Sequence, residues 1–244
     1  MTARAAVEQE SQWALSPEGS LRVCLWQDLG RLDYRSAWDL QLQHVEKLKN
    51  GSGQDSLFFV EHPPVVTSGR NGKSENLLVS EDRLEQLGIE YHETDRGGDV
   101  TFHGPGQVVC YPVMDLKCWK RDVGAYLRAL EEVLILTLAD YGLEGRRDPT
   151  ATGVWVGDAK VAAMGVHLSR WVTSHGFALN VATDLDYFRY IVPCGLTRPV
   201  TSLEKLLGKS PDVGELKGRI LKRFGTVFRR TMVCSGLDNR ERGS

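Results

Sequence analysis

The segment from Arg96 to Asn180 contains several strand patterns but only one long helical pattern. The helical pattern follows Asp122, a good N-cap, and places its apolar residues on one stripe that ends at Gly142. Two strand patterns precede the helix and three follow it, the first two of these joined by Gly157 and Asp158, a pair that fits a hairpin turn. Strands that follow one another directly form a meander, so the segment predicts a largely antiparallel sheet rather than a series of βαβ units.

The rest of the chain adds strands and helices to this sheet. Strand patterns occur at 21–26, 56–62, 65–72 and 89–94, and helical patterns at 34–50, 80–88 and 210–227, with a further short helix expected from Thr201. The last two helices are predicted to begin at the capping box Thr201–Glu204 and at Ser210 with Pro211, and Ser80 is the predicted cap of the 80–88 helix. Together these strands and helices predict an α+β domain over residues 21–233, with tails at 1–20 and 234–244.

Composition excludes several classes of function. Hydrophobic residues make up 41% of the 244 residues, and the net charge of -2 provides no field that would attract nucleic acid. No apolar run is long enough to span a membrane, and the first twenty residues do not resemble a secretory signal. No large apolar stripe remains unexplained, which favours a monomer.

The cysteines and histidines predict neither disulfides nor a metal site. The five cysteines are odd in number and widely spaced, and the six histidines show no spacing typical of metal ligands. We therefore expect a reducing, cytoplasmic compartment. Cys24 and Cys110 lie in apolar strand patterns and are expected to be core residues, whereas Cys118 and Cys234 have no predicted role.

Two residues are candidates for covalent chemistry. Cys194 lies between Pro193, which fixes the chain before the thiol, and Gly195, which lets backbone approach closely behind it. Such a turn would leave N–H groups able to stabilise an oxyanion beside a nucleophilic thiol. Lys160 opens a strand of small apolar residues, where a partly desolvated ammonium could lower the pKa of a thiol and shuttle a proton.

Both residues also have ordinary structural interpretations. Most unpaired cysteines simply pack in the interior, and a lysine beside a hairpin turn is usually a solvated surface charge. A Cys–His pair is the more common arrangement for thiol catalysis, so His175 competes with Lys160 as the partner of Cys194. The residues alone leave these choices open.

Glycines and small residues mark a candidate ligand slot. Four glycines fall between Arg96 and Gly106, in a spacing that matches neither a dinucleotide-binding nor a phosphate-binding loop. They predict either two ordinary turns or a backbone rim against which a ligand lies. The small apolar segments Ala163–Gly165 and Gly176–Ala178 lie on adjacent predicted strands and suit an aliphatic chain, although packing also explains them. For His103, at a strand end, a structural hydrogen bond is favoured over acid–base chemistry.

Three segments of the chain resemble the lipoyl(octanoyl) transferase family. They are RGGDVTFHGPGQ, AKVAAMGVHLSRWVTSHGFALN and IVPCGL, in this order and at the separations expected for the family. The resemblance extends from about Leu21 to about residue 232. It implies a biotin/lipoyl protein ligase-like fold and an enzyme of lipoate biosynthesis that moves an octanoyl group onto a lipoyl-domain lysine.

The resemblance also implies roles for individual residues. Cys194 would hold the acyl group as a thioester, and Lys160 would act as its acid and base. The implied substrate-binding residues are Arg96, Gly97, Gly98, Asp99, Val100, Thr101, Phe102, His103, Ala163, Met164, Gly165, Gly176, Phe177 and Ala178.

The implied donor is octanoyl-acyl carrier protein, with the acyl group delivered on phosphopantetheine. The implied acceptors are the lipoyl domains of 2-oxoacid dehydrogenase E2 subunits and the glycine cleavage H protein. No cofactor is expected, neither ATP nor a metal, because the donor thioester is already activated.

Two other functions stay open. An ATP-dependent lipoate or biotin ligase would share the fold and a double glycine, but it would activate a free acid and need no cysteine nucleophile. A non-catalytic protein that binds an acylated carrier would use Cys194 structurally and form no acyl adduct. The pairing of Cys194 with Lys160 favours the transferase.

Overall fold

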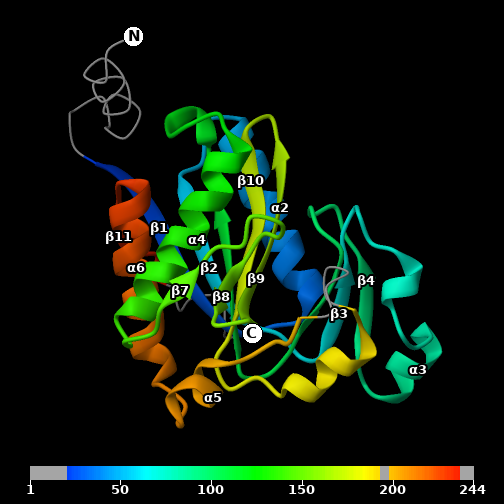
Figure 1. The fold of residues 1–244 in the computed structure, drawn as a ribbon. Helices are drawn as coiled ribbons and strands as arrows, with labels where there is room; N and C mark the ends of the chain where they lie inside the picture. The colour runs from blue at the N-terminus through cyan, green and yellow to red at the C-terminus, as the bar shows by residue number, and fades with distance from the viewer. Residues whose placement is uncertain (1–20, 193–197, 237–244) are drawn as a thin grey trace.

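The centre of the computed structural model, which describes residues 21–192 and 198–236, is an eight-stranded mixed sheet (Figure 1). Its strand order is β11-β1-β2-β6-β10-β9-β8-β7. The strands are β1 (Arg22–Arg31), β2 (Asp55–Glu61), β6 (Gln107–Val113), β7 (Gly145–Arg146), β8 (Val154–Val156), β9 (Ala159–Ser169), β10 (Val172–Asn180) and β11 (Arg230–Cys234). The β1–β2 and β1–β11 pairs are parallel and the other neighbouring pairs of this sheet are antiparallel. The predicted α+β fold with a largely antiparallel sheet is confirmed.

Helices cover both faces of the main sheet. α2 (Tyr34–Lys49) packs on one face, and α4 (Val123–Ala139) packs with α6 (Val213–Phe228) on the other. In β2, Phe58 belongs to the core on the α2 side and Phe59 to the core on the α4 and α6 side. Because successive strand residues point to opposite faces, a strand covered on both sides is apolar throughout.

A second, three-stranded sheet lies beside the main one, at the right of Figure 1. Its order is β4-β3-β5, with β3 parallel to β4 and antiparallel to β5. This part of the chain comprises β3 (Val65–Ser68), η1 (Ser74–Asn76), α3 (Glu81–Gln86), β4 (Glu90–Glu93), β5 (Val100–His103) and η3 (Leu185–Tyr190). It has a small hydrophobic core of its own, separate from the two cores of the main sheet.

Several local predictions are confirmed. Ser80 and Asp122 cap α3 and α4 by accepting the backbone N–H of Arg83 and Ala125. The turn at Gly157–Asp158 joins β8 to β9 as a hairpin. The short helix η2 (Leu116–Cys118), between β6 and α4, was not predicted.

The predicted starts of the last two helices are wrong by one or two residues. Ser202, not Thr201, caps α5 (Leu203–Leu207), and Asp212, not Ser210, caps α6. Each loop offers several short polar side chains close together, and any of them could accept a backbone N–H. The position of the helix in the tertiary structure, rather than composition, selects the cap.

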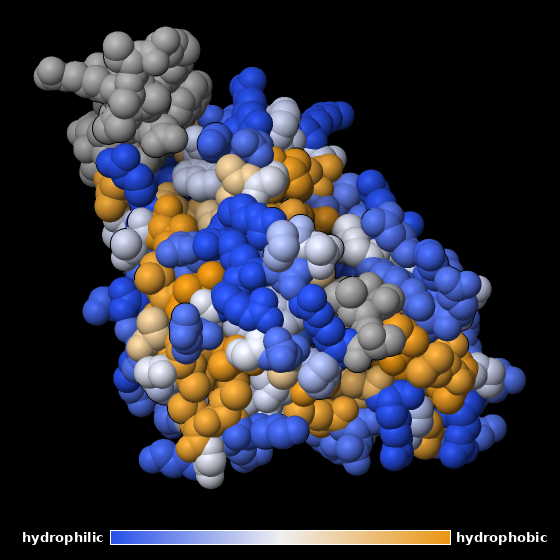
Figure 2. All heavy atoms as spheres, viewed as in Figure 1, coloured by the Kyte–Doolittle hydropathy of each residue, from blue (hydrophilic) through white to orange (hydrophobic). Residues whose placement is uncertain are grey.

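The surface is predominantly hydrophilic over the face shown in Figure 2, with apolar side chains gathered toward the end of the molecule where α5 and η3 lie. Within residues 21–192 and 198–236, no helix combines the length and the apolar content needed to cross a bilayer.

Candidate functional site

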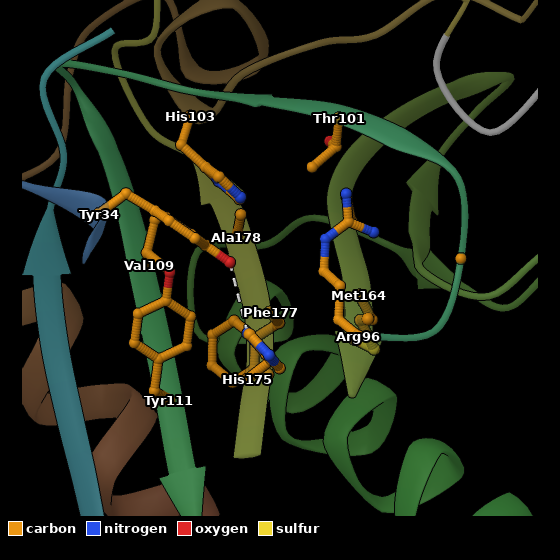
Figure 3. Close-up of a pocket in the computed structure, with 14 residues that line it drawn as sticks. Tyr34, Arg96, Thr101, His103, Val109, Tyr111, Met164, His175, Phe177 and Ala178 are labelled. Carbon is orange, nitrogen blue, oxygen red and sulfur yellow. Dashed lines mark hydrogen bonds between the residues drawn. The ribbon is translucent and has the colours of Figure 1, made fainter. Parts of the chain in front are cut away.

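A pocket lies on the α2 side of the main sheet, between β6, β9 and β10 and the loop that leads into β5 (Figure 3). We call it the main pocket. Ten of the predicted substrate-binding residues line it: Arg96, Gly98, Thr101, His103, Ala163, Met164, Gly165, Gly176, Phe177 and Ala178. Segments far apart in the sequence thus meet at one apolar slot with a polar rim.

Two glycines make room for the pocket wall. Gly165 and Gly176 face each other across the β9–β10 pair. A Cβ at Gly165 would lie 2.6 Å from the carbonyl oxygen of Gly97, and one at Gly176 would overlap the carbonyl oxygen of Cys110. The backbone N–H of Gly97 donates to Val166 O at 2.8 Å, which fixes the Arg96–Gly98 loop against β9. Glycine is required at these strand positions because another backbone approaches closely.

Arg96 joins the second sheet to this loop. Its guanidinium donates to the carbonyl oxygen of Thr67 at 2.6 Å, to the Thr67 hydroxyl at 2.9 Å and to the carbonyl oxygen of Gly97 at 3.2 Å. The side chain is buried. A charged donor with oxygen acceptors fixed around it makes a rigid side of the pocket.

Four of the predicted substrate-binding residues lie outside the main pocket. Val100 and Phe102 point into the core of the second sheet, because the alternation of β5 directs only Thr101 and His103 to the pocket. Gly97 and Asp99 line a wider neighbouring groove.

The Asp99 carboxylate is engaged in local structure. It accepts from the side chain of Asn76 at 2.5 Å and from the backbone of Val100 at 2.7 Å. Asp99 therefore holds η1 to the start of β5.

Three lining residues were not predicted as site residues: Tyr34, Val109 and Tyr111. Tyr34 occupies the first turn of α2, where the sequence showed only an apolar helical stripe, and Figure 3 shows its side chain crossing the pocket. Val109 and Tyr111 alternate along β6 on the same side of the sheet. Only the pairing of β6 with β10 could have revealed them.

Burial disfavours the charged form of two histidines at the pocket. Burial lowers the pKa of His62 to about 4 and the pKa of His103 to about 3. His62 donates from Nδ1 to the Leu32 carbonyl at 2.7 Å, so its Nε2 accepts from the Tyr111 hydroxyl at 2.9 Å. His103 Nδ1 donates to Gln107 Oε1 at 2.8 Å, the structural hydrogen bond favoured from the sequence.

His175 is held at one end of the main pocket. Its Nε2 donates to Asp95 Oδ1 at 2.7 Å, so its Nδ1 accepts from the Tyr34 hydroxyl at 3.4 Å. Its backbone has a positive φ of 57°, rare for a residue with a side chain, and its N–H donates to Gln41 Oε1 at 2.7 Å. Burial lowers the pKa of His175, and the hydrogen bond from His175 lowers the pKa of Asp95.

Lys160 is buried, in contrast to the solvated lysine that a hairpin position usually indicates. Its ammonium lies 5.0 Å from the centroid of the Trp155 ring, and its exposed fraction is 6%. Gly153 leaves space for the lysine, since a Cβ there would lie 2.5 Å from Lys160 Cε. A lysine in such surroundings has a specific structural or chemical function rather than a role in solubility.

The Lys160 side chain lines a smaller cavity that adjoins the main pocket. We call it the Lys160 pocket, and Thr101, Ala163 and Ala178 line both cavities. Gln107 and Asn180 are also in its lining and are hydrogen-bonded to each other at 2.9 Å. The lysine end of the site and the apolar slot therefore lie next to each other and share part of their lining.

Cys194 lies outside the described residues, but the chain on either side of residues 193–197 is well anchored. Before them, the Val192 N–H donates to Asn76 O at 2.8 Å. After them, Arg198 pairs with Asp148, and the backbone of Lys160 exchanges hydrogen bonds with Pro199 and Thr201, both at 2.9 Å.

The chain leaving the 193–197 segment thus runs directly beside Lys160. His175 pairs with Val166, six positions from Lys160 along β9, which is about 20 Å at the usual rise of a strand.

Cys24 and Cys110 are buried, as predicted, and burial raises the pKa of both thiols.

Comparison with known proteins agrees with this geometry. The lipoyl protein ligase A/B catalytic domain family matches residues 33–225. An octanoyltransferase from Solibacter usitatus is 58% identical over 208 residues, covering 85% of this chain and 94% of its own. One from Koribacter versatilis is 50% identical over 212 residues, covering 84% of each chain.

Solved structures show the same fold at low sequence identity. A putative lipoate protein ligase from T. acidophilum superposes with a TM-score of 0.69 at 16% identity, covering 87% of this chain and 88% of that one. Lipoate-protein ligase A bound with ATP gives 0.66 at 18% identity, covering 87% and 89%. The predicted lipoyl ligase-like fold is confirmed, and the chain belongs to the lipoyl protein ligase A/B catalytic domain family and, within it, to the octanoyltransferases, which are acyltransferase enzymes.

Proposed function

We propose that this enzyme transfers an octanoyl group from acyl carrier protein to a lysine of a lipoyl domain, by way of a thioester on Cys194. The observation that supports this most is the buried Lys160, placed where an apolar pocket meets the chain leading from Cys194. A relative in fold is described as a lipoate protein ligase with its E2 lipoyl domain, which supports acceptors of that kind. The proposed acceptors are E2 lipoyl domains and the glycine cleavage H protein.

The first transfer loads the enzyme. Cys194 gives its proton to Lys160, and the thiolate attacks the carbonyl carbon of the octanoyl thioester. Backbone N–H groups stabilise the oxyanion of the tetrahedral intermediate. When that intermediate collapses, the bond to the phosphopantetheine sulfur breaks and the Lys160 ammonium protonates the leaving thiolate. Carrier protein leaves as a free thiol.

The second transfer delivers the acyl group. The neutral amine of a lipoyl-domain lysine attacks the Cys194 thioester, Lys160 takes a proton from it, and an amide forms as the C–S bond breaks. The proton then returns from Lys160 to the Cys194 thiolate, so the enzyme is regenerated. Conversion of a thioester to an amide is downhill, and the proposed reaction needs no ATP.

The first test is the mass of the intact protein after mixing with octanoyl-acyl carrier protein in the absence of ATP. We expect an octanoyl adduct on the wild type that hydroxylamine removes and that Cys194→Ser lacks. Cys118→Ser is the matched control, because Cys118 lies on η2, away from the lining of both pockets, and its loss should leave the adduct unchanged.

The same measurement separates the alternative functions. If the adduct is absent without ATP but lipoyl domains are modified once ATP and free octanoate are supplied, the chain is a ligase and the transferase proposal is wrong. An adduct that persists in Cys194→Ser would place the nucleophile elsewhere.

Gly153→Ala tests the position of the lysine. The added Cβ would lie 2.5 Å from Lys160 Cε, on a residue whose φ of 138° already disfavours a side chain. We expect octanoyl loading to slow by about 10²-fold, the effect of misplacing a catalytic group by about 1 Å. Gly218→Ala, within α6 where nothing lies near the added Cβ, is the matched control and should load at the wild-type rate. Equal loading rates in the two variants would contradict a role for this contact.

A further inference from the structure

The end of the main pocket farthest from Lys160 is polar. The Tyr34 hydroxyl bonds to His175 Nδ1 at 3.4 Å, and His175 Nε2 bonds to Asp95 at 2.7 Å. Figure 3 shows the Tyr34 side chain reaching from α2 across the slot toward His175. An otherwise apolar slot therefore ends at a hydrogen-bonded network of three side chains from three separate segments.

The length of the slot can be read from the β9–β10 register. Ala163 and Ala178, which pair with each other, line both cavities and mark the junction with the Lys160 pocket. The pairing partner of His175 is Val166, three positions further along β9, which is about 10 Å. Between these two levels lies the Gly165–Gly176 pair, which lines the slot with backbone rather than with side chains.

The network at this end of the main pocket is held firmly. Tyr34 is 2% exposed, with its ring stacked on that of His103 at 6.2 Å and tilted against that of His62 at 5.4 Å. His175 is fixed through its backbone by Gln41, as well as through both ring nitrogens. Neither side chain can swing away without breaking buried hydrogen bonds, which leaves polar groups unsatisfied.

We propose that the Tyr34–His175–Asp95 network sets the length of acyl chain that the enzyme accepts. This proposal rests on the proposed function, in that the main pocket holds the acyl chain with its carbonyl toward Lys160. A chain that reaches the network gains apolar contact up to that level. A longer chain must displace the Tyr34 hydroxyl from His175 or bend back on itself.

The two possibilities, a closed slot and an open slot, predict different dependences on chain length. In an open apolar slot each added methylene strengthens binding by about fourfold, from the transfer free energy of one CH₂. In a closed slot this gain stops at the length that fills it, and longer chains bind more weakly. The slope of affinity against chain length therefore reports where the slot ends.

The test is calorimetric titration of the protein with hexanoate, octanoate, decanoate and dodecanoate. For the wild type we expect affinity to rise to octanoate and then fall, with dodecanoate at least tenfold weaker. Tyr34→Leu, which removes the ring and the hydroxyl, should shift the ratio of dodecanoate to octanoate affinity at least tenfold toward dodecanoate. Tyr34→Phe removes the hydroxyl that bonds to His175 but keeps the ring, so it should shift this ratio toward dodecanoate by less than Tyr34→Leu does.

Tyr141→Leu is the matched control, since Tyr141 follows α4 on the opposite side of the sheet and should give the wild-type series. A wild-type series that keeps rising through dodecanoate would overturn the proposal even if Tyr34→Leu fails to fold. So would a Tyr34→Leu series identical to that of the wild type.

Free acids bind without acylating Cys194, so the titration is independent of transfer. The mass measurement could show no octanoyl adduct while the fatty-acid affinities of the wild type and of Tyr34→Leu differ as expected. In that case the proposed transfer fails and the length-determining network stands.

Discussion

Lys160→Met is expected to slow octanoyl loading of Cys194 by about 10²–10⁴-fold, the usual loss when a positioned acid–base group is removed. Methionine fills nearly the same space beside Trp155 and Gly153 but can neither accept the thiol proton nor protonate the leaving thiolate. The measurement is the time course of adduct formation by intact mass, with octanoyl-acyl carrier protein in excess. Lys205→Met, on α5, is the control and should load at the wild-type rate.

A purely structural lysine would give a different result. Removing a buried charge that only supports the fold should change the melting temperature, not the chemistry of the thiol. We therefore also expect alkylation of the Cys194 peptide by iodoacetamide to require a higher pH in Lys160→Met than in the wild type, because a neighbouring ammonium stabilises a thiolate. An unchanged alkylation profile together with wild-type loading would assign Lys160 to structure alone.

Much of the fold follows from local patterns in the sequence. Strand alternation, one long amphipathic helix and the Gly157–Asp158 turn together predict the meander of β8, β9 and β10 and the helix α4. These features depend on residues close in the sequence, so periodicity and turn chemistry are sufficient to find them.

The second sheet and the last strand could not be predicted in this way. β11 was not predicted, and it pairs with β1 from the other end of the chain. The segment Val65–His103 yields short strand patterns, but only tertiary contacts separate them into their own sheet. Pairing between distant segments depends on which surfaces meet, and a local pattern does not contain that information.

In the candidate site too, some residues can be predicted from the local sequence and others depend on tertiary contacts. The glycine positions Gly165 and Gly176 are visible in the sequence because a close backbone approach leaves few other choices, and Gly98 is visible because its φ of 90° favours glycine. Tyr34 and the closing role of His175 are not visible, since they depend on α2 lying over β10. A tyrosine on an apolar helical stripe is indistinguishable from a core residue until its hydroxyl is seen to face a cavity.

Arg230→Met is expected to lower the free energy of unfolding by about 3–5 kcal/mol, the usual loss when one partner of a buried ion pair is removed. Arg230 Nε donates to Asp55 Oδ2 at 2.8 Å, and its other nitrogens donate to the carbonyl oxygens of Phe228 and Cys118, each at 3.1 Å. The pair therefore ties the edge strand β11 to β2 and to η2. The measurement is urea unfolding followed by circular dichroism at pH 8.

The loss of unfolding free energy in Arg230→Met should depend on pH, because this variant leaves the Asp55 carboxylate buried without its cation. Burial raises the pKa of Asp55, and Arg230 opposes that rise. Without Arg230 the folded-state pKa of Asp55 rises further above its unfolded value, so the folded variant binds a proton more readily than the unfolded chain. The destabilisation is then complete above the folded-state pKa and decreases as the pH falls below it, so we expect a smaller loss at pH 5 than at pH 8.

Two further variants separate the ion pair from simple loss of packing. Arg229→Met changes the neighbouring exposed arginine and should alter the free energy of unfolding by no more than about 0.5 kcal/mol. Asp55→Asn combined with Arg230→Met removes both charges while the asparagine oxygen can still accept from Asp115 N, which now lies 2.9 Å from the carboxylate. If the unpaired charge causes the loss, this double variant is more stable than Arg230→Met alone at pH 8. A double variant as unstable as the single one would show instead that the guanidinium acts through its bonds to Phe228 and Cys118.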